Sequence, residues 1–130
     1  MNTHKTGLTI LVVDDEFIFR ELNKRRIDDF LKKRVCYNIL TANGLEHALE
    51  IVAHKSIDLV FTDMFMNGRD DSGLYLADRI KSFNNNTKVF IVSNADLKHI
   101  KEKANGWYAH GCFQLPLCQK DLETAFRDFI

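Results

Sequence analysis

The 130-residue chain has the length of one ordinary domain, because a single hydrophobic core usually holds about 100–200 residues. Its composition, 45% hydrophobic and 28% charged with six glycines and one proline, excludes disordered, collagen-like and low-complexity proteins. Eighteen basic residues balance eighteen acidic ones, so the net charge gives no argument for a nucleic-acid or membrane partner. We therefore expect a single domain over residues 1–130, with neither nucleic acid nor membrane as a direct partner.

Five short apolar runs rich in β-branched residues predict five strands, each followed by a polar turn. The predicted strands cover residues 8–13, 37–40, 58–62, 88–92 and 111–115. The first run is almost wholly apolar, which is typical of a strand covered on both faces. Such strands favour a parallel sheet buried between layers of helices.

Apolar residues that recur every three or four positions predict a helix after each strand. The helical stretches cover residues 16–34, 45–52, 74–80, 97–107 and 122–129, with the least regular spacing in the first. Asn43 and Asn94 stand where N-caps belong, and Pro116 closes the fifth strand. The alternation predicts an α/β fold of the (βα)5 type, a doubly wound five-stranded parallel sheet with helices on both faces.

The sequence also favours a soluble protein of the cytoplasm. No apolar stretch approaches the roughly 20 residues of a transmembrane helix, and the first seven residues lack the apolar core of a signal peptide. Cys36, Cys112 and Cys118 form an odd number without a CxxC pair, which favours a reducing compartment. A zinc site built on His110, Cys112 and Cys118 is disfavoured, because their spacing matches no common zinc finger and suggests no fourth ligand.

Acidic and hydroxyl side chains follow three of the predicted strands. Asp14 and Asp15 follow the first strand, Asp63 the third and Ser93 the fourth. The carboxyl ends of parallel strands share one edge of the sheet, so three carboxylates should converge there. Such crowding requires a retained proton or a cation, and all-oxygen ligands suit Mg²⁺. The alternative, that Asp14 and Asp15 only cap the first helix, leaves Asp63 and Ser93 unexplained.

Further residues accompany these strand ends at set spacings. They are Met66 three residues after Asp63, Gly73 at the opening of a helix, Gly111 and Pro116. Together with the Asp14-Asp15 pair and Ser93, they make nearly the whole chain resemble the receiver domain of two-component response regulators. The resemblance implies the flavodoxin-like receiver fold, with any output domain outside residues 1–130.

The resemblance implies a phosphorelay signalling protein rather than an enzyme. Asp63 would accept a phosphoryl group from a sensor histidine kinase or phosphotransfer protein, forming an aspartyl phosphate. Mg²⁺ would be the cofactor, bound by Asp14, Asp15, Asp63 and the backbone carbonyl of Phe65. The Ser93 hydroxyl would bind the phosphoryl group and switch the face formed by the fourth helix, fifth strand and fifth helix. A homodimer through that face is a further expected partner.

The sequence departs from the family mainly at Leu115, where the family has a Lys before Pro116. Leucine cannot neutralise the nearly two negative charges that a phosphoryl group adds. Arg69 and Lys120 are the candidates to replace this cation. Asn67 stands where the family usually has Pro, in a loop with about two additional residues.

A smaller departure lies in the fifth strand. Cys112 stands where the family often has an aromatic side chain that moves inward on phosphorylation. A one-residue bulge in the strand could bring the neighbouring Phe113 to that place.

Other classes of function remain beside the receiver hypothesis. A degenerate pseudo-receiver, acting as a phosphorylation-independent protein-binding or dimerisation module, would need no lysine before Pro116. A phosphatase or hydrolase would need a second carboxylate two residues after Asp63, where Phe65 stands. A flavin carrier would need a hydroxyl- and glycine-rich loop after the first strand, where this chain is acidic.

Overall fold

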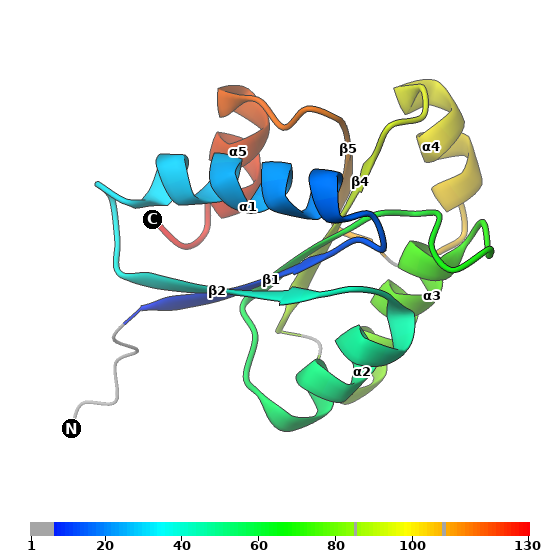
Figure 1. The fold of residues 1–130 in the computed structure, drawn as a ribbon, viewed down its shortest axis with the longest axis horizontal. Coiled ribbons are helices and arrows are strands. Elements are labelled where there is room, and N and C mark those ends of the chain that lie inside the picture. Colours follow the sequence, from blue (N-terminus) through cyan, green and yellow to red (C-terminus); the bar gives the residue numbers. More distant parts are fainter. Residues whose placement is uncertain (1–6, 85, 108) are drawn as a thin grey trace.

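The computed structural model describes residues 7–84, 86–107 and 109–130, within which five strands alternate with five helices (Figure 1). The strands are β1 (Leu8–Val13), β2 (Tyr37–Ala42), β3 (Leu59–Thr62), β4 (Lys88–Ser93) and β5 (Gly111–Gln114). The helices are α1 (Phe17–Leu31), α2 (Leu45–His54), α3 (Ser72–Phe83), α4 (Leu97–Ala104) and α5 (Gln119–Phe126). Residues 1–6, on which the signal-peptide argument rests, lie outside the described segments.

All strand pairs are parallel, in the order β2-β1-β3-β4-β5, which confirms the predicted doubly wound, flavodoxin-like fold. Figure 1 shows α1 and α5 together on one face of the sheet, with α2 and α3 on the other. Because β2 lies on one side of β1 and β3 on the other, the order of strands reverses between β1 and β3. Ligands of doubly wound sheets bind beyond the carboxyl ends of the strands at such a reversal.

Hydrophobic cores cover both faces of the sheet, because successive side chains of a strand face opposite sides. Ile10 and Val12 of β1 pack with α1 and α5, whereas Leu11 and Val13 pack with α2 and α3. Aromatic rings in contact fill much of the first core; they belong to Phe30, Phe61, Phe90, Phe113 and Phe126. Full burial of one such side chain contributes about 1.5–3 kcal/mol, so both cores fix the strand ends firmly.

Three helices end earlier than predicted: α1 ends at Leu31 rather than at residue 34, and α4 and α5 are also shorter. α4 ends at Ala104, and Trp107 lies outside it because Gly106, at a φ of +89°, turns the chain away. α5 ends at Phe126, so Phe129 also lies beyond its helix. In the described part of the chain, no helix combines the length and apolar character needed to cross a lipid bilayer.

The predicted N-caps were wrong. Gly44 precedes α2 and Asp96 precedes α4, and neither Asn43 nor Asn94 occupies the cap position. The first amide of α2 is instead bonded by a side chain from a loop distant in sequence, which local spacing does not reveal.

The register of β5 contains no bulge. Cys112 pairs with Ile91 and Phe113 with Val92 in an uninterrupted ladder. Phe113 therefore faces the core of α1 and α5, while Cys112 packs on the α4 side. The suggested bulge that would exchange these two side chains is excluded, because the apolar packing of Phe113 against Phe90 stabilises the regular register.

Candidate functional site

Asp14, Asp15 and Asp63 lie together at the carboxyl ends of β1 and β3. Each offers one carboxylate oxygen, and these oxygens all lie within 4.8 Å of one another. The juxtaposition follows from the pairing of Val13 with Thr62, after which Asp63 donates its backbone N–H to the Val13 carbonyl at 3.0 Å. Adjacent parallel strands thus bring into contact carboxylates far apart in the sequence.

A pocket of about 480 Å³ contains these carboxylates. Phe65, Ser93 and Leu115 line the same pocket, from the loop after β3, the end of β4 and the segment after β5. Residues at or just after the ends of β1, β3, β4 and β5 therefore surround one cavity.

Among the described residues that line the pocket, the acidic cluster has no cationic neighbour. Burial, followed by the nearby Asp14 carboxylate, raises the pKa of Asp63 to about 7. Burial also raises the pKa of Asp14 to about 6, with smaller effects from the charges of Asp15 and Glu16. Without a cation, the cluster therefore retains protons near neutral pH, because burial disfavours the charged carboxylates and adjacent carboxylates repel each other. A bound divalent cation would remove this repulsion.

Backbone amides hold two of the carboxylates in place. Met64 donates its N–H to Asp63 Oδ1 at 2.8 Å, and Glu16 donates its N–H to Asp14 Oδ1 at 2.9 Å. Gly73 fixes the neighbouring backbone, because a Cβ at that position would lie 2.2 Å from the Asp63 carbonyl oxygen. The glycine at the start of α3 is thus required by close packing against the acidic loop.

Ser93 ends β4 with its side chain buried at the pocket wall. Its Oγ accepts the N–H of Ala95 at 3.2 Å, which leaves the hydroxyl hydrogen available for a group in the pocket. The Ser93 carbonyl accepts the N–H of Leu115 at 2.9 Å, so the ends of β4 and β5 are connected. Movement of one strand end would therefore be transmitted to the other.

Leu115 presents an apolar, half-buried side chain to this pocket. None of the described residues that line the pocket is a lysine or an arginine. The Arg69 guanidinium is bonded to Asp71 and lies over the Tyr75 ring, 4.6 Å from its centre. Lys120 is exposed on α5. Neither of these two cations lines the pocket in place of the missing lysine.

Arg20 is a neighbouring cation that the sequence analysis missed. Its Nη1 donates to the backbone carbonyl of Asp14 at 2.9 Å, and its charge partly offsets the raised pKa of that carboxyl. The contact depends on how α1 is placed relative to the end of β1, so the spacing of residues along the helix does not reveal it.

The sequence model of the response regulator receiver domain family matches residues 10–127, and the chain belongs to this family. It is 28% identical over 125 residues to the transcriptional regulatory protein MalR of Bacillus subtilis, covering 94% of this chain and 50% of that protein. The chain thus spans about half the length of this curated relative. Receiver domains are two-component signalling modules, typically non-catalytic, that interact with histidine kinases or phosphotransfer proteins and with effector domains.

Solved structures of the family show the same fold. The response regulator TrrA of Thermotoga maritima, in complex with Mg²⁺-BeF, is 26% identical with a TM-score of 0.77, over 95% of this chain and 99% of that chain. A response regulator receiver domain protein of Clostridium thermocellum is 30% identical with a TM-score of 0.68, over 93% and 92% of the two chains. Both likenesses extend over more than nine-tenths of each chain.

Without Mg²⁺, the two raised pKa values should make the protein less stable as the pH rises from 5 to 8. Asp14 and Asp63 have pKa values near 6 and 7 in the folded state, against 3.8 for the free side chain. The folded state therefore binds more protons than the unfolded state in this window, and the free energy of unfolding falls as these protons are lost. The melting temperature measured in EDTA should fall by several degrees across the window.

The variant Asp63→Asn separates this effect from other titrations. Burial lowers the pKa of His110, so His110 contributes stability that is lost as the pH falls, opposite in sign to the carboxylates. His110 is present in both proteins, so the wild type should lose stability relative to Asp63→Asn as the pH rises. Parallel pH profiles for the two proteins would contradict the account of the acidic cluster.

Proposed function

We propose that this receiver domain, over residues 1–130, accepts a phosphoryl group on Asp63 from a sensor histidine kinase or a phosphotransfer protein. The observation that supports this most strongly is the convergence of Asp14, Asp15 and Asp63 in one pocket with the Ser93 hydroxyl. A carboxylate at a strand end, beside a metal-binding cluster and a hydroxyl donor, has the parts that phosphoryl transfer requires.

The acidic cluster fits Mg²⁺. Its donors are carboxylate oxygens, and the raised pKa values of Asp14 and Asp63 indicate a cluster that needs a cation. Asp14, Asp15 and Asp63 would hold the ion together with the Phe65 backbone carbonyl, since Phe65 lines the same pocket. When bound, Mg²⁺ supplies the positive charge that allows an anionic phosphoryl donor to approach an anionic acceptor.

The protein groups would then act in a defined order. An Asp63 carboxylate oxygen attacks the phosphorus of a phosphohistidine, the P–N bond breaks and the imidazole leaves. The Met64 amide keeps the Asp63 carboxylate oriented during this attack. The Ser93 hydroxyl donates a hydrogen bond to a phosphoryl oxygen, and its connection to Leu115 transmits the change to β5.

Beryllofluoride, a mimic of the phosphoryl group, tests this assignment by amide chemical shifts. With millimolar Mg²⁺, we expect shifts of the amides of Met64, Phe65 and Ala95, because these lie beside Asp63 and Ser93. EDTA should remove the shifts, and Asp15→Asn should strongly weaken them. Shifts that persist in EDTA, or that leave the amides of Met64, Phe65 and Ala95 unchanged, would place the ligand outside the acidic cluster.

A pseudo-receiver is the second candidate function, and the position of Leu115 favours it. The pocket has an apolar wall where the family has an ammonium group, so less positive charge would offset the negative charge of a phosphoryl group. Such a protein would bind its partner without phosphorylation. The absence of any response to beryllofluoride with Mg²⁺ would favour this function.

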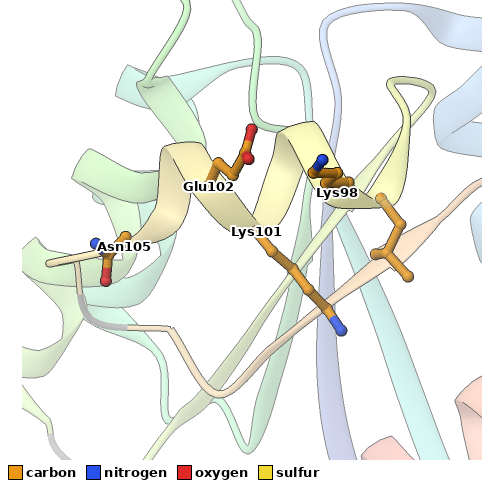
Figure 2. Close-up of a pocket in the computed structure, with 5 residues that line it drawn as sticks. Lys98, Lys101, Glu102 and Asn105 are labelled. Atoms are coloured by element: carbon orange, nitrogen blue, oxygen red, sulfur yellow. The ribbon is translucent and has the colours of Figure 1, made fainter.

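The face formed by α4, β5 and α5 is the proposed output surface. A cavity of about 660 Å³ lies on the exposed side of α4, lined by Leu97, Lys98, Lys101, Glu102 and Asn105 (Figure 2). Two lysine side chains at this cavity would suit an acidic partner surface. We extend the proposal to a homodimer through this face. The cytoplasm is the proposed location, because three free cysteines suit a reducing compartment.

A further inference from the structure

The loop after β3 contains a tight two-residue turn. Met66 and Arg69 form an antiparallel bridge, with N–H to carbonyl distances of 3.1 and 3.0 Å in the two directions. Between them, Asn67 and Gly68 have φ values of +56° and +75°. Asn-Gly is the favoured pair for a turn with two left-handed residues, so the turn is a stable local unit. The direction of the Asn67 amide is consequently fixed relative to the bridge.

Asn67 makes two long-range hydrogen bonds from this turn. Its backbone N–H donates to Asp15 Oδ2 at 3.0 Å, and its side-chain Oδ1 accepts the N–H of Leu45 at 3.3 Å. Leu45 is the first residue of α2, whose preceding residue Gly44 has no side chain to cap the helix. One residue therefore bonds both the acidic cluster and the start of a helix.

The packing around the Asn67 side chain is close. A Cβ built on Gly44 would lie 2.5 Å from Asn67 Oδ1, so even alanine at position 44 would displace the side-chain amide of Asn67. Glycine at this place allows the side chain of Asn67 to reach the amide of Leu45.

Asp15 is the member of the acidic cluster that most needs orientation. It is exposed, whereas Asp14 is buried and Asp63 half-buried. An exposed carboxylate loses rotational freedom when it binds a metal ion, and a hydrogen bond that already restricts it reduces that loss. The donor that the structure places on Asp15 is the amide of Asn67.

We propose that Asn67 is a positioning residue for Asp15 in Mg²⁺ binding, a role that rests on the magnesium site proposed above. The backbone N–H of Asn67 holds Asp15 within the cluster. The hydrogen bond from the Leu45 N–H to the Asn67 side chain keeps that backbone N–H in place. Hydrogen bonds to the ligands of a metal ion typically affect its affinity strongly. The start of α2 is thereby connected to the metal site through one asparagine.

A simpler role for Asn67 is formation of the turn alone, because asparagine tolerates positive φ. The two roles predict different behaviour of Asn67→Gly, which keeps the turn and the backbone N–H but removes the acceptor for Leu45. If Asn67 served only the turn, this variant would bind Mg²⁺ like the wild type.

The test measures the Mg²⁺ dissociation constant of the full chain by amide chemical-shift titration, with hydrogen exchange at Leu45 as a second readout. Asn67→Gly should weaken binding by roughly threefold, the value of one modest hydrogen bond. Asn67→Pro removes the N–H and cannot adopt positive φ, so it should weaken binding by about tenfold or more. Both variants should speed exchange of the Leu45 amide, since each removes its acceptor.

Two further variants test the role of Asn67. Gly44→Ala should also raise the dissociation constant, because it displaces the Asn67 side chain while leaving the sequence of the turn unchanged. Lys103→Gln breaks the exposed ion pair between Lys103 and Asp70, a contact of the same loop at 2.8 Å that does not involve Asp15. This control should leave Mg²⁺ affinity within about twofold of the wild type.

The outcomes distinguish this inference from the proposed function. A wild type that does not bind Mg²⁺ at millimolar concentration would overturn the magnesium site and the role of Asn67 with it. A wild type that binds, with an unchanged dissociation constant in Asn67→Gly and Gly44→Ala but faster exchange at Leu45, would overturn the role of Asn67 alone. An equal loss of Mg²⁺ affinity in Lys103→Gln would also overturn the role of Asn67. The variants other than Asn67→Pro test this role even if Asn67→Pro does not fold.

Discussion

Substitution of Asp63 by asparagine is expected to abolish phosphoryl acceptance and to raise the free energy of unfolding at pH 8 in EDTA by about 1–2 kcal/mol. The amide has nearly the shape of the carboxylate but carries no charge, so it cannot act as the nucleophile. The substitution also removes the cost of burying a charged group and the repulsion from Asp14, which together raise the pKa of Asp63 to about 7. Chemical denaturation and the response to beryllofluoride measure the two effects.

Asp78→Asn is a matched control for this substitution, because Asp78 is exposed on α3 away from the acidic pocket. It should change neither stability at pH 8 nor the response to beryllofluoride. A loss of stability in Asp63→Asn would mean that the carboxylate is stabilised in the fold by a partner that outweighs the repulsion from Asp14.

Substitution of Leu115 by lysine is expected to increase the change that beryllofluoride causes at the output face. The side chain of residue 115 lines the acidic pocket, so an ammonium group there can pair with the phosphoryl mimic. Such a contact contributes on the order of 1.5–3 kcal/mol, which is enough to shift a two-state equilibrium separated by a few kcal/mol. Amide shifts across residues 93–129 should therefore increase.

Leu115→Met keeps the pocket wall apolar with an unbranched side chain and serves as the control. It should respond to beryllofluoride like the wild type. If the wild type already responds fully and the lysine adds nothing, another cation compensates the phosphoryl charge. Arg20, bonded to the Asp14 carbonyl, would then be the first candidate.

The strands and the acidic cluster could be predicted from sequence because their signals are local and their geometry is general. The apolar pattern of residues 8–13 defines a buried strand, and strand ends in a parallel sheet meet at one edge. The convergence of Asp14 and Asp63 follows from these two facts alone. Leu115 lies in the acidic pocket, at the position before Pro116 where the family has its lysine.

The contacts that sequence reasoning missed depend on how loops and helices pack. The cap of α2 comes from Asn67, which is 22 residues away from Leu45, so the prediction that Asn43 caps the helix was wrong. The contact of Arg20 with the Asp14 carbonyl depends on the direction in which α1 leaves β1. The prediction that α4 continues to Trp107 was wrong, because a glycine with positive φ turns the chain away while the apolar spacing continues.

The most direct test of the receiver function is the intact mass of the wild-type chain after incubation with a small phosphodonor and Mg²⁺. We expect a gain of one phosphoryl group, no gain in EDTA and no gain in Asp63→Asn. A wild type that gains no phosphoryl group, even with a strong donor and saturating Mg²⁺, would contradict phosphoryl acceptance at Asp63 and favour the pseudo-receiver.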